Sequence, residues 1–181
     1  MTDHPLTPDT KAKLEQVSVA TLATALYKRG LRHQAIQDVR PVAAKGRNMV
    51  GPAFTLRYMP AREDRNQLVE FRNPEHPQRV AIETCPPGHV LVMDSRKSAT
   101  AASAGDILIT RLMMRGGAGV VTDGGFRDAM NIGELEMPAY HSRPSSPTNL
   151  TTNEAIDINV PIGCGDAPVF PGDIVVGDDD S

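Results

Sequence analysis

The chain has 181 residues, a formal net charge of −3, 4% aromatic residues and two cysteines, Cys85 and Cys164. This length fits one domain with a substantial core, and two cysteines cannot build a disulfide framework, so a reducing cytoplasm is the expected compartment. The weak charge and scarce aromatic residues argue against nucleic acid as a partner, and no apolar run reaches the ~18 residues of a membrane span.

The first half of the chain predicts one helix and one long strand. Ser18 precedes apolar residues at helical spacing, which predicts a helix that stops near Gly30. Residues 50–58 have the composition of a strand. Residues 60–79 mix arginines with acidic residues, and we expect a solvated loop there with at most a short helix.

The second half alternates between short strands and helices. The pattern predicts strands at 89–94, 119–123, 138–140, near 156–162 and at 173–176, helices at 107–115 and 132–136, and small-residue or Pro/Ser-rich loops at 95–104 and 142–149. No internal repeat or linker divides this series. The sequence therefore predicts an α/β fold with a mixed sheet in a single domain, 1–181.

Several familiar catalytic motifs are absent. The glycines at 116–119 lack the Gly-Lys-Ser/Thr ending of a phosphate-binding loop and the spacing of a dinucleotide fingerprint. The chain also contains no H-E-x-x-H, C-x-x-C or G-x-S-x-G. The five histidines are scattered, and His89, at the start of an apolar strand, is expected to pack rather than to act as a ligand.

Two strand-to-helix junctions carry the polar residues of interest. Asp94 and the pair Gly105-Asp106 follow one predicted strand, and Asp123 follows the next. Ligands of open α/β sheets bind outside the carboxyl ends of the strands, where such loops converge. A helix that begins at Gly105 also offers free backbone amides, which makes its start an anion site; these amides belong to Asp106, Ile107 and Leu108.

The second junction adds a guanidinium beside a carboxylate. Arg127 and Asp128 follow Gly124 and Gly125, which we expect to let the backbone turn tightly. Carboxylates, a guanidinium and an anion-binding helix start suit a hard divalent metal with a carboxylate substrate. The residues alone leave a second interpretation open, in which the aspartates cap helices and Arg127 pairs with Asp128 at a surface turn.

The ordered set of motifs resembles one superfamily. Gly105-Asp106, twenty intervening residues and Arg127-Asp128, within the run Val121–Asp128, are similar to the signature that joins the class II 4-hydroxy-4-methyl-2-oxoglutarate/4-carboxy-4-hydroxy-2-oxoadipate aldolases to the regulators of ribonuclease activity A. The similarity covers nearly the whole chain and includes residues 87–94, 160–165 and 171–178. It implies an α/β/β/α sandwich of the swivelling β/β/α type around a mixed central sheet.

The resemblance also implies a role for each site residue. Asp128 would bind Mg²⁺ or Mn²⁺ directly, and Asp106 would hold a water on that metal. The amides of the turn from Gly105 to Leu108 would hold the substrate carboxylate, and Arg127 would contact the 2-keto oxygen. The implied reaction is cleavage of a 4-hydroxy-2-oxo acid to pyruvate and a second oxo compound, with oxaloacetate decarboxylation as a side activity.

Metal and guanidinium suit this chemistry because cleavage leaves a pyruvate enolate, whose developing negative charge must be stabilised. We expect a water organised by the metal to take the 4-hydroxyl proton. A Schiff-base aldolase is the rival mechanism, and Lys97 is the one lysine that lies near the predicted site. The other alternative is a protein-binding regulator of ribonuclease activity without chemistry; the presence of both Asp106 and Asp128 favours the enzyme.

Two features differ from the family pattern. Asp166 stands where relatives commonly have a second glycine, and residues 60–79 resemble the family least. The resemblance implies a homotrimer or hexamer with sites near subunit interfaces. It also implies a further strand and helix after residue 178, so we expect the domain to lack the family's C-terminal strand and helix, together with a carboxylate that relatives supply to a neighbour's metal site.

Overall fold

The computed structural model of the chain describes residues 6–66 and 72–181. The helices are α1 (Pro8–Leu14), α2 (Val19–Tyr27), α3 (Pro77–Thr84), α4 (Asp106–Met114) and α5 (Ala129–Glu134), with a 3-10 helix η2 (Asn149–Thr151). The strands are β1 (Arg40–Pro41), β2 (Met49–Pro60), β3 (Val90–Asp94), β4 (Ala102–Ala104), β5 (Gly119–Thr122), β6 (Gly125–Phe126), β7 (Ala139–His141), β8 (Arg143–Pro144), β9 (Asn153–Ile158), β10 (Ile162–Cys164), β11 (Ala167–Val169) and β12 (Ile174–Gly177).

The main sheet is mixed, as predicted. Its centre consists of β2, β3, β5 and β7, which run parallel to one another. Antiparallel strands complete it: β1 pairs with β7, and β12 and β9 pair with the two halves of the long strand β2. Helices join the parallel strands, which is the usual crossover connection. The α/β class and the mixed central sheet are therefore confirmed.

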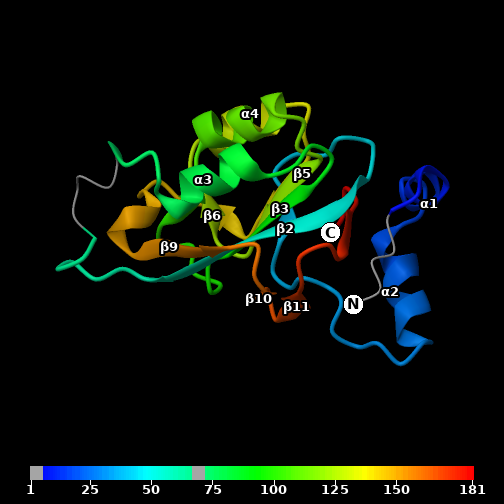
Figure 1. Cartoon of the computed structure of the whole chain (residues 1–181). Helices are drawn as coiled ribbons and strands as arrows, with labels where there is room; N and C mark the ends of the chain where they lie inside the picture. Colours follow the sequence, from blue (N-terminus) through cyan, green and yellow to red (C-terminus); the bar gives the residue numbers. More distant parts are fainter. Residues whose placement is uncertain (1–5, 67–71) are drawn as a thin grey trace.

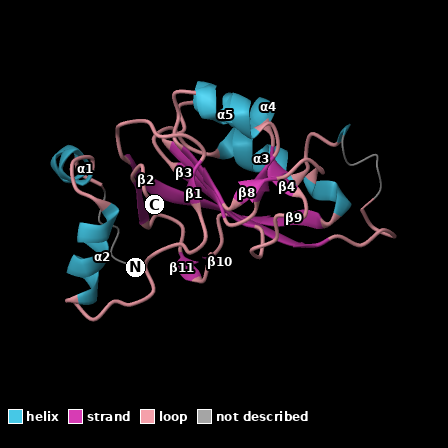
Figure 2. Ribbon diagram, turned by 180° about the vertical axis from the view of Figure 1, so that it is seen from behind, coloured by secondary structure: helices cyan, strands magenta, loops and turns pink. Residues whose placement is uncertain are grey.

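The central strands are buried on both faces. Along β3, Leu91 and Met93 face a core beneath the helices, while Val90 and Val92 face a second core on the other side of the sheet. This alternation follows from the two-residue repeat of a strand, and burial on both faces explains the unbroken apolar run at 90–93. Helices α3, α4 and α5 cover one face, whereas β10 and β11 lie on the opposite side and α1 and α2 lie together at one end (Figures 1 and 2).

A second, small parallel sheet lies beyond the first. Its strand order is β4-β6-β8, and each member follows β3, β5 or β7 in the chain, so the small sheet repeats the order of the large one. The predicted loops at 95–104 and 142–149 were therefore wrong in part, because β4 and β8 lie within them. Strands of two or three residues, such as Ala102–Ala104 and Arg143–Pro144, are too short to show the apolar alternation by which a strand is recognised in sequence.

Most of the other predicted elements are confirmed with small shifts. Ser18 caps α2 by accepting a hydrogen bond from the Thr21 backbone amide at 3.2 Å, and Gly30 follows the helix with φ of +86°. The helix expected at 132–136 instead spans α5, because Asp128 rather than a later residue forms its N-cap. The interpretation of 60–79 as a loop holds for 61–66, part of this range (67–71) lies outside the described residues, and α3 begins at Pro77.

The departure from the family at Asp166 lies in a tight hairpin turn. Gly165 and Asp166 are the two residues between β10 and β11, and both have positive φ, at +51° and +63°. Left-handed conformation at both central positions is typical of the type I′ hairpin turn, which Gly and Asp tolerate. The Asp166 carboxylate forms an ion pair with Lys97, and this pair ties the turn to the loop after β3.

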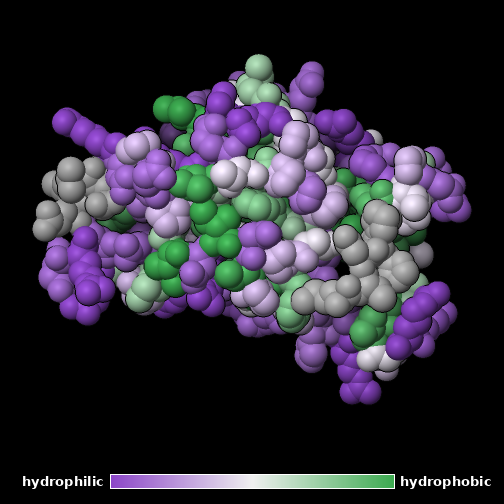
Figure 3. Space-filling model, in the orientation of Figure 1, coloured by the Kyte–Doolittle hydropathy of each residue, from purple (hydrophilic) through white to green (hydrophobic). Residues whose placement is uncertain are grey.

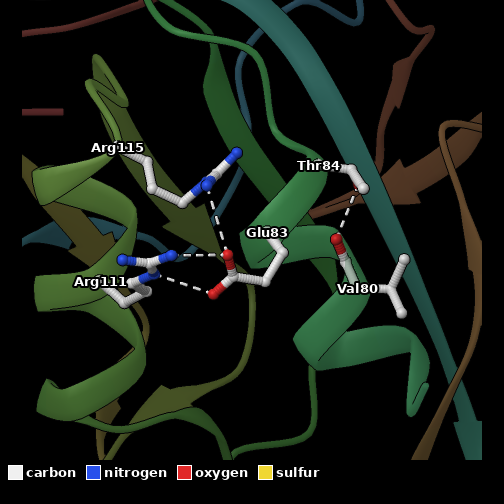
Figure 4. A network of polar contacts seen from close by, with 5 residues as sticks. All are labelled: Val80, Glu83, Thr84, Arg111 and Arg115. Atoms are coloured by element: carbon white, nitrogen blue, oxygen red, sulfur yellow. Dashed lines mark hydrogen bonds and ion pairs between the residues drawn. The ribbon is translucent and has the colours of Figure 1, made fainter. Parts of the chain in front are cut away.

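An exposed ionic network joins α3 to α4 (Figure 4). Arg111 donates two hydrogen bonds to the Glu83 carboxylate, at 2.9 and 2.8 Å, and Arg115 adds a contact of 3.3 Å. These bonds lower the pKa of Glu83 and raise that of Arg111. The network links two helices that both line the candidate site described below.

The surface is mixed in polarity. Figure 3, drawn in the orientation of Figure 1, shows hydrophilic residues around most of the periphery and a hydrophobic area near the middle of the face in view. Three large apolar side chains on α4 and α5 are also largely exposed: Ile107 at 81%, Met114 at 73% and Met130 at 85%. Within residues 6–66 and 72–181, the helices are too short or too polar to cross a membrane.

Candidate functional site

The small sheet, rather than the large one, brings the predicted site residues together. Strand β4 leads into the Gly105-Asp106 junction, and the neighbouring strand β6 leads into Arg127-Asp128. The two strands are parallel with Ala104 opposite Phe126, and the Arg127 amide donates to the Ala104 carbonyl at 3.1 Å. Both junctions therefore emerge side by side at the same end of this sheet.

All six predicted site residues line one cavity of about 230 Å³. They are Gly105, Asp106, Ile107, Leu108, Arg127 and Asp128. This volume is smaller than the ~300–1,000 Å³ common for drug-sized ligands, so the cavity suits a small metabolite.

Arg127 and Asp128 contact each other inside the cavity. The Arg127 Nε donates to Asp128 Oδ2 at 3.2 Å, and both side chains are partly exposed. Asp128 has φ of +55° and ψ of +37°, a left-handed conformation that aspartate tolerates better than most residues. An ion pair between partly exposed groups contributes little to stability. The ion pair between Arg127 and Asp128 that the second interpretation predicted is therefore present, but it lies at the wall of the cavity.

The start of α4 is less open than predicted. The N-cap residue Gly105 has no side chain to cap the first amides of α4, and residues 105–108 line the cavity. The Ile107 amide, however, donates to Asp106 Oδ1 at 2.8 Å, so it is engaged within the protein. Asn131 of α5 donates to the other oxygen, Asp106 Oδ2, at 2.9 Å. Asp106 is therefore held in place from two sides.

Gly105 is required by close packing. A Cβ atom at this position would lie 2.8 Å from Arg127 Cγ and 3.3 Å from Asp128 Oδ2. Its φ of −123° is open to any residue, so the constraint is the approach of Arg127 rather than backbone conformation.

Gly124 and Gly125 have a different role from the one predicted. Neither adopts positive φ in the structure, so they are not needed for a tight turn. A Cβ at 124 would lie 2.7 Å from Ser95 Cβ, and one at 125 would lie 2.7 Å from Ser145 Cβ. These glycines let the small sheet pack closely against the segments around it.

Asp94 and Asp123 do not belong to the cavity. The buried Asp123 carboxylate accepts hydrogen bonds from the backbone amides of Ser95, Lys97 and Gly165, at 2.6, 3.0 and 3.1 Å. Burial raises its pKa in spite of these three donors. Asp94 accepts from the Arg96 amide at 2.9 Å. Both carboxylates organise the loop that separates β3 from β4.

Lys97 also lies away from the cavity. It lines a different surface hollow with Arg40 and Arg143, and its ion pair with Asp166 raises its pKa. A Schiff-base nucleophile needs an accessible neutral amine, which a raised pKa opposes. The position of Lys97 therefore argues against covalent catalysis.

The remaining lining residues were not predicted from the sequence. They come from α3 and from the segment around η2: His76, Gln78, Arg79, Thr148, Asn149 and Leu150, with Ala102 and Ala104 at the base. The signal that could have identified them was weak, because α3 follows the least regular stretch of the chain and residues 148–150 end a Pro/Ser-rich loop.

The donor set fits a divalent cation with few protein ligands. Asp128 Oδ1 has no hydrogen-bond partner within residues 6–66 and 72–181, whereas Oδ2 accepts from Arg127. The same described ranges contain no group of three or more His, Cys, Asp or Glu side chains that could enclose a metal. A single carboxylate beside a second, fixed one suits Mg²⁺, which retains several waters and is bound through one or two carboxylates.

Comparison with known proteins identifies the family. The family model described as Aldolase/RraA matches residues 19–181, which is most of the chain. The chain belongs to the RraA-like family. Among solved structures, Streptomyces coelicolor RraAS2, described as an unusual member of the RNase ES inhibitor RraA protein family, superimposes with a TM-score of 0.81 at 30% identity. That similarity covers 96% of this chain and 82% of the other.

Two curated relatives of this RraA-like chain carry the name "Putative 4-hydroxy-4-methyl-2-oxoglutarate aldolase". The protein from Halalkalibacterium halodurans is 37% identical over 100 residues, which are 55% of this chain and 47% of the relative. The protein from Shewanella oneidensis is 33% identical over 95 residues, 51% of this chain and 57% of the relative. The chain thus matches about half the length of these curated relatives.

Proposed function

We propose that this chain is a divalent-metal-dependent class II aldolase that cleaves a 4-hydroxy-2-oxo acid to pyruvate and a second oxo compound. The observation that carries the proposal is the meeting of α4, Arg127 and two carboxylates in one small cavity. The names of the two curated relatives support the same reaction class. Oxaloacetate decarboxylation is expected beside it, because it passes through the same pyruvate enolate.

The start of α4 would bind the substrate's 1-carboxylate. The amides of Asp106 and Leu108 lie at the positive end of the helix, which favours an anion there. The Ile107 amide donates to Asp106 instead, and it contributes by holding the Asp106 carboxylate in place. The remaining amides would orient the substrate's 1-carboxylate before the reaction begins.

Arg127 would stabilise the oxygen at C2 as negative charge develops. Its Nε is engaged by Asp128, which fixes the guanidinium and leaves its terminal NH groups to donate to the oxyanion. Donors fixed in advance need no reorganisation during the reaction, and loss of one such donor typically costs ~100–1,000-fold in kcat.

Asp128 would hold Mg²⁺ or Mn²⁺ through its unengaged oxygen, and Asp106, oriented by Asn131, would hold a water beside it. When bound, the cation supplies Lewis-acid stabilisation of the same oxyanion.

The direct test is release of pyruvate from a 4-hydroxy-2-oxo acid or from oxaloacetate, followed by coupled reduction with NADH and lactate dehydrogenase. Wild-type protein with Mg²⁺ or Mn²⁺ should release pyruvate, and Arg127→Met should lower kcat by about 100-fold or more. Absence of pyruvate from every substrate with both metals would contradict the proposal.

The second candidate is a protein-binding regulator of ribonuclease activity. RraAS2, described as belonging to a family of ribonuclease inhibitors, resembles this chain over nearly its whole length, and this observation favours the alternative. Inhibition of a ribonuclease E-type enzyme that persists in Asp128→Asn, with no pyruvate release from wild type, would support the regulator in place of the aldolase.

We also propose that the chain forms a homotrimer or hexamer. The largely exposed Ile107 and Met130 lie on the two helices that flank the cavity, and such side chains are common where subunits meet. Light scattering coupled to size-exclusion chromatography measures the mass directly. A monomer at micromolar concentration would contradict this assignment.

A further inference from the structure

A second cavity lies on the face of the main sheet opposite the helices α3, α4 and α5. Its volume is about 540 Å³, which is within the ~300–1,000 Å³ range common for ligand sites. Its floor includes Met49, Val121 and Tyr140, which belong to the second core. Its walls are α2, residues 31–39, and the strands β11 and β12 with the turn that joins them. The cavity shares no lining residue with the candidate active site.

The lining of this cavity is mostly apolar, and part of it remains in contact with solvent. Three large apolar side chains line the cavity and are nevertheless exposed: Leu31, Phe170 and Ile174. Single exposed apolar residues are common on protein surfaces, but a group of them around one hollow is typical of a binding site. The lining therefore favours a ligand with a substantial hydrocarbon part.

Helix α2 forms one wall of the cavity without being buried itself. Its side chains are apolar or carry a hydroxyl group, yet none of its nine residues is buried. Polar contacts hold its N-terminal end instead: the Val19 amide donates to Asp178 Oδ2 at 2.8 Å, and Asn48 Nδ2 donates to the Val17 carbonyl at 2.7 Å. A helix that is apolar all round is normally covered on several sides. The side of α2 that lines the cavity is thus available to an apolar molecule.

The chain that leaves α2 carries positive charge beside the cavity. Four basic residues lie within six positions: Lys28, Arg29, Arg32 and His33. Residues 16–37 contain no Asp or Glu, and Lys28 and Arg32 form no ion pair within residues 6–66 and 72–181. Arg32 lies between Leu31 and His33, which both line the cavity. Cations without a counter-charge therefore stand next to the apolar lining.

The acidic side chains near the cavity are engaged by backbone amides. Asp173 lines the cavity, and its Oδ2 accepts from the Phe170 amide at 2.8 Å, which closes the turn between β11 and β12. Asp178 accepts from Val19 at the start of α2, at the other end of that helix from Arg32. These carboxylates have structural partners, so they leave the positive charge after α2 unmatched.

We propose that this cavity binds a free single-chain carboxylate of the fatty-acid class, with the hydrocarbon chain between α2 and the sheet and the carboxylate beside Arg32 and His33. The hydrocarbon chain would cover the exposed Leu31, Phe170 and Ile174, and burial of apolar surface supplies the affinity. The carboxylate would provide the missing counter-charge. This site is independent of the aldolase function, because its residues take no part in the proposed reaction.

Calorimetric titration with a chain-length series tests the apolar part of the proposal. Octanoate, decanoate and dodecanoate, each below the concentration at which it forms micelles, should bind wild type with affinities that rise about tenfold for every two methylene groups. Decyltrimethylammonium has a chain of similar length but a cationic head group. It should bind at least about tenfold more weakly than decanoate at low salt, because the cations after α2 repel it.

Two variants test the two parts of the site separately. Arg32→Glu reverses one charge and should weaken decanoate about tenfold at low salt without weakening decyltrimethylammonium. Ala35→Glu places a carboxylate on an exposed residue of the lining and should weaken every member of the carboxylate series at least about tenfold. The matched control is Arg65→Glu, an exposed position in the segment 61–66, which lies at the opposite end of the molecule from α2 (Figure 1). It should bind like wild type.

Failure of decanoate to bind wild type would overturn the proposal, and so would equal affinity along the chain-length series or undiminished binding of decanoate by Arg32→Glu. Sedimentation of the protein with phosphatidylglycerol vesicles, without binding of monomeric decanoate, would assign the basic segment to a membrane surface and would also overturn it. These titrations contain neither metal nor 2-oxo acid. Their outcome is therefore independent of the pyruvate assay, and either proposal can fail while the other stands.

Discussion

At the scale of single residues, the site depends on a few side chains whose positions are fixed by close contacts with their neighbours. Gly105 has no side chain because Arg127 passes where its Cβ would be. Asp106 is fixed by a backbone amide and by Asn131, and Asp128 is held in left-handed conformation at the start of α5. The spacing of Gly105-Asp106 and Arg127-Asp128 predicted these residues, whereas Asn149 and Arg79, which line the same cavity, carry no local signature and emerge only from tertiary contacts.

Replacement of Gly105 by alanine should separate activity from stability. The added methyl group would displace Arg127, whose side chain is about half exposed and has room to move away, so the fold can adjust. We expect the free energy of unfolding to change by less than about 1 kcal/mol and kcat to fall at least about tenfold. Denaturant titration and the pyruvate assay measure the two quantities. Full activity in Gly105→Ala would mean that the position of Arg127 is not critical.

His141 predicts how stability depends on pH. Its ring is buried, stacks on Phe126 with centroids 5.6 Å apart, and has a pKa lowered to about 4 by burial and by the charge of Arg40. The unfolded chain takes up this proton near pH 6.5, before the folded chain does. The free energy of unfolding is therefore not reduced by His141 above pH 6.5. As pH falls from 6.5 towards 4, it decreases by at most about 3 kcal/mol on account of this residue.

Denaturant titrations of wild type and His141→Gln between pH 7 and 4.5 check this dependence. The loss of stability on acidification should be smaller in His141→Gln than in wild type. His33→Gln, which alters an exposed histidine, is the matched control and should follow wild type. Parallel curves for His141→Gln and wild type would contradict the role of the buried imidazole.

At the scale of elements, the prediction from sequence was accurate for long periodic segments and incomplete for short ones. Helices α2 and α4 and strands β2, β3 and β5 have regular apolar spacing, so their positions could be predicted within a few residues, although no residue of α2 is buried. Strands β4, β6 and β8 have two or three residues each, too few to show an apolar period in the sequence, although Ala104 and Phe126 are buried in the core. The site was therefore expected at the ends of β3 and β5. It forms instead at the ends of β4 and β6, the short strands that follow them in the chain.

The ionic network between α3 and α4 should contribute modestly to thermal stability, and this contribution should depend on salt concentration. Glu83→Gln removes the charge that engages Arg111 and Arg115 on the surface. We expect a small decrease in the thermal midpoint at low salt that disappears in 1 M NaCl, because exposed pairs are screened. Glu63→Gln, another exposed position, is the control. A decrease that persists at high salt would show that Glu83 stabilises α3 by other means.

At the scale of the whole molecule, two sheets of corresponding strand order convert sequence spacing into a site. The large sheet supplies the buried core. Each strand of the small sheet follows one strand of the large sheet in the chain, in the same order, and this arrangement places β4 beside β6. Membership of the RraA-like family agrees with this architecture. The family resemblance could be predicted from the motif spacing, but the part of the candidate active site that α3 and η2 supply could not, since these elements meet only in the folded chain.

The most direct test of the central claim is pyruvate release by wild type and Asp128→Asn across a titration of Mg²⁺ after treatment with EDTA. Asparagine preserves the size of the side chain and tolerates the left-handed conformation, so the thermal midpoint should change little. Wild type should lose activity with EDTA and regain it with Mg²⁺, whereas Asp128→Asn should remain at least about 100-fold slower at every concentration. Wild-type activity that survives EDTA, or an Asp128→Asn variant as active as wild type, would contradict the account.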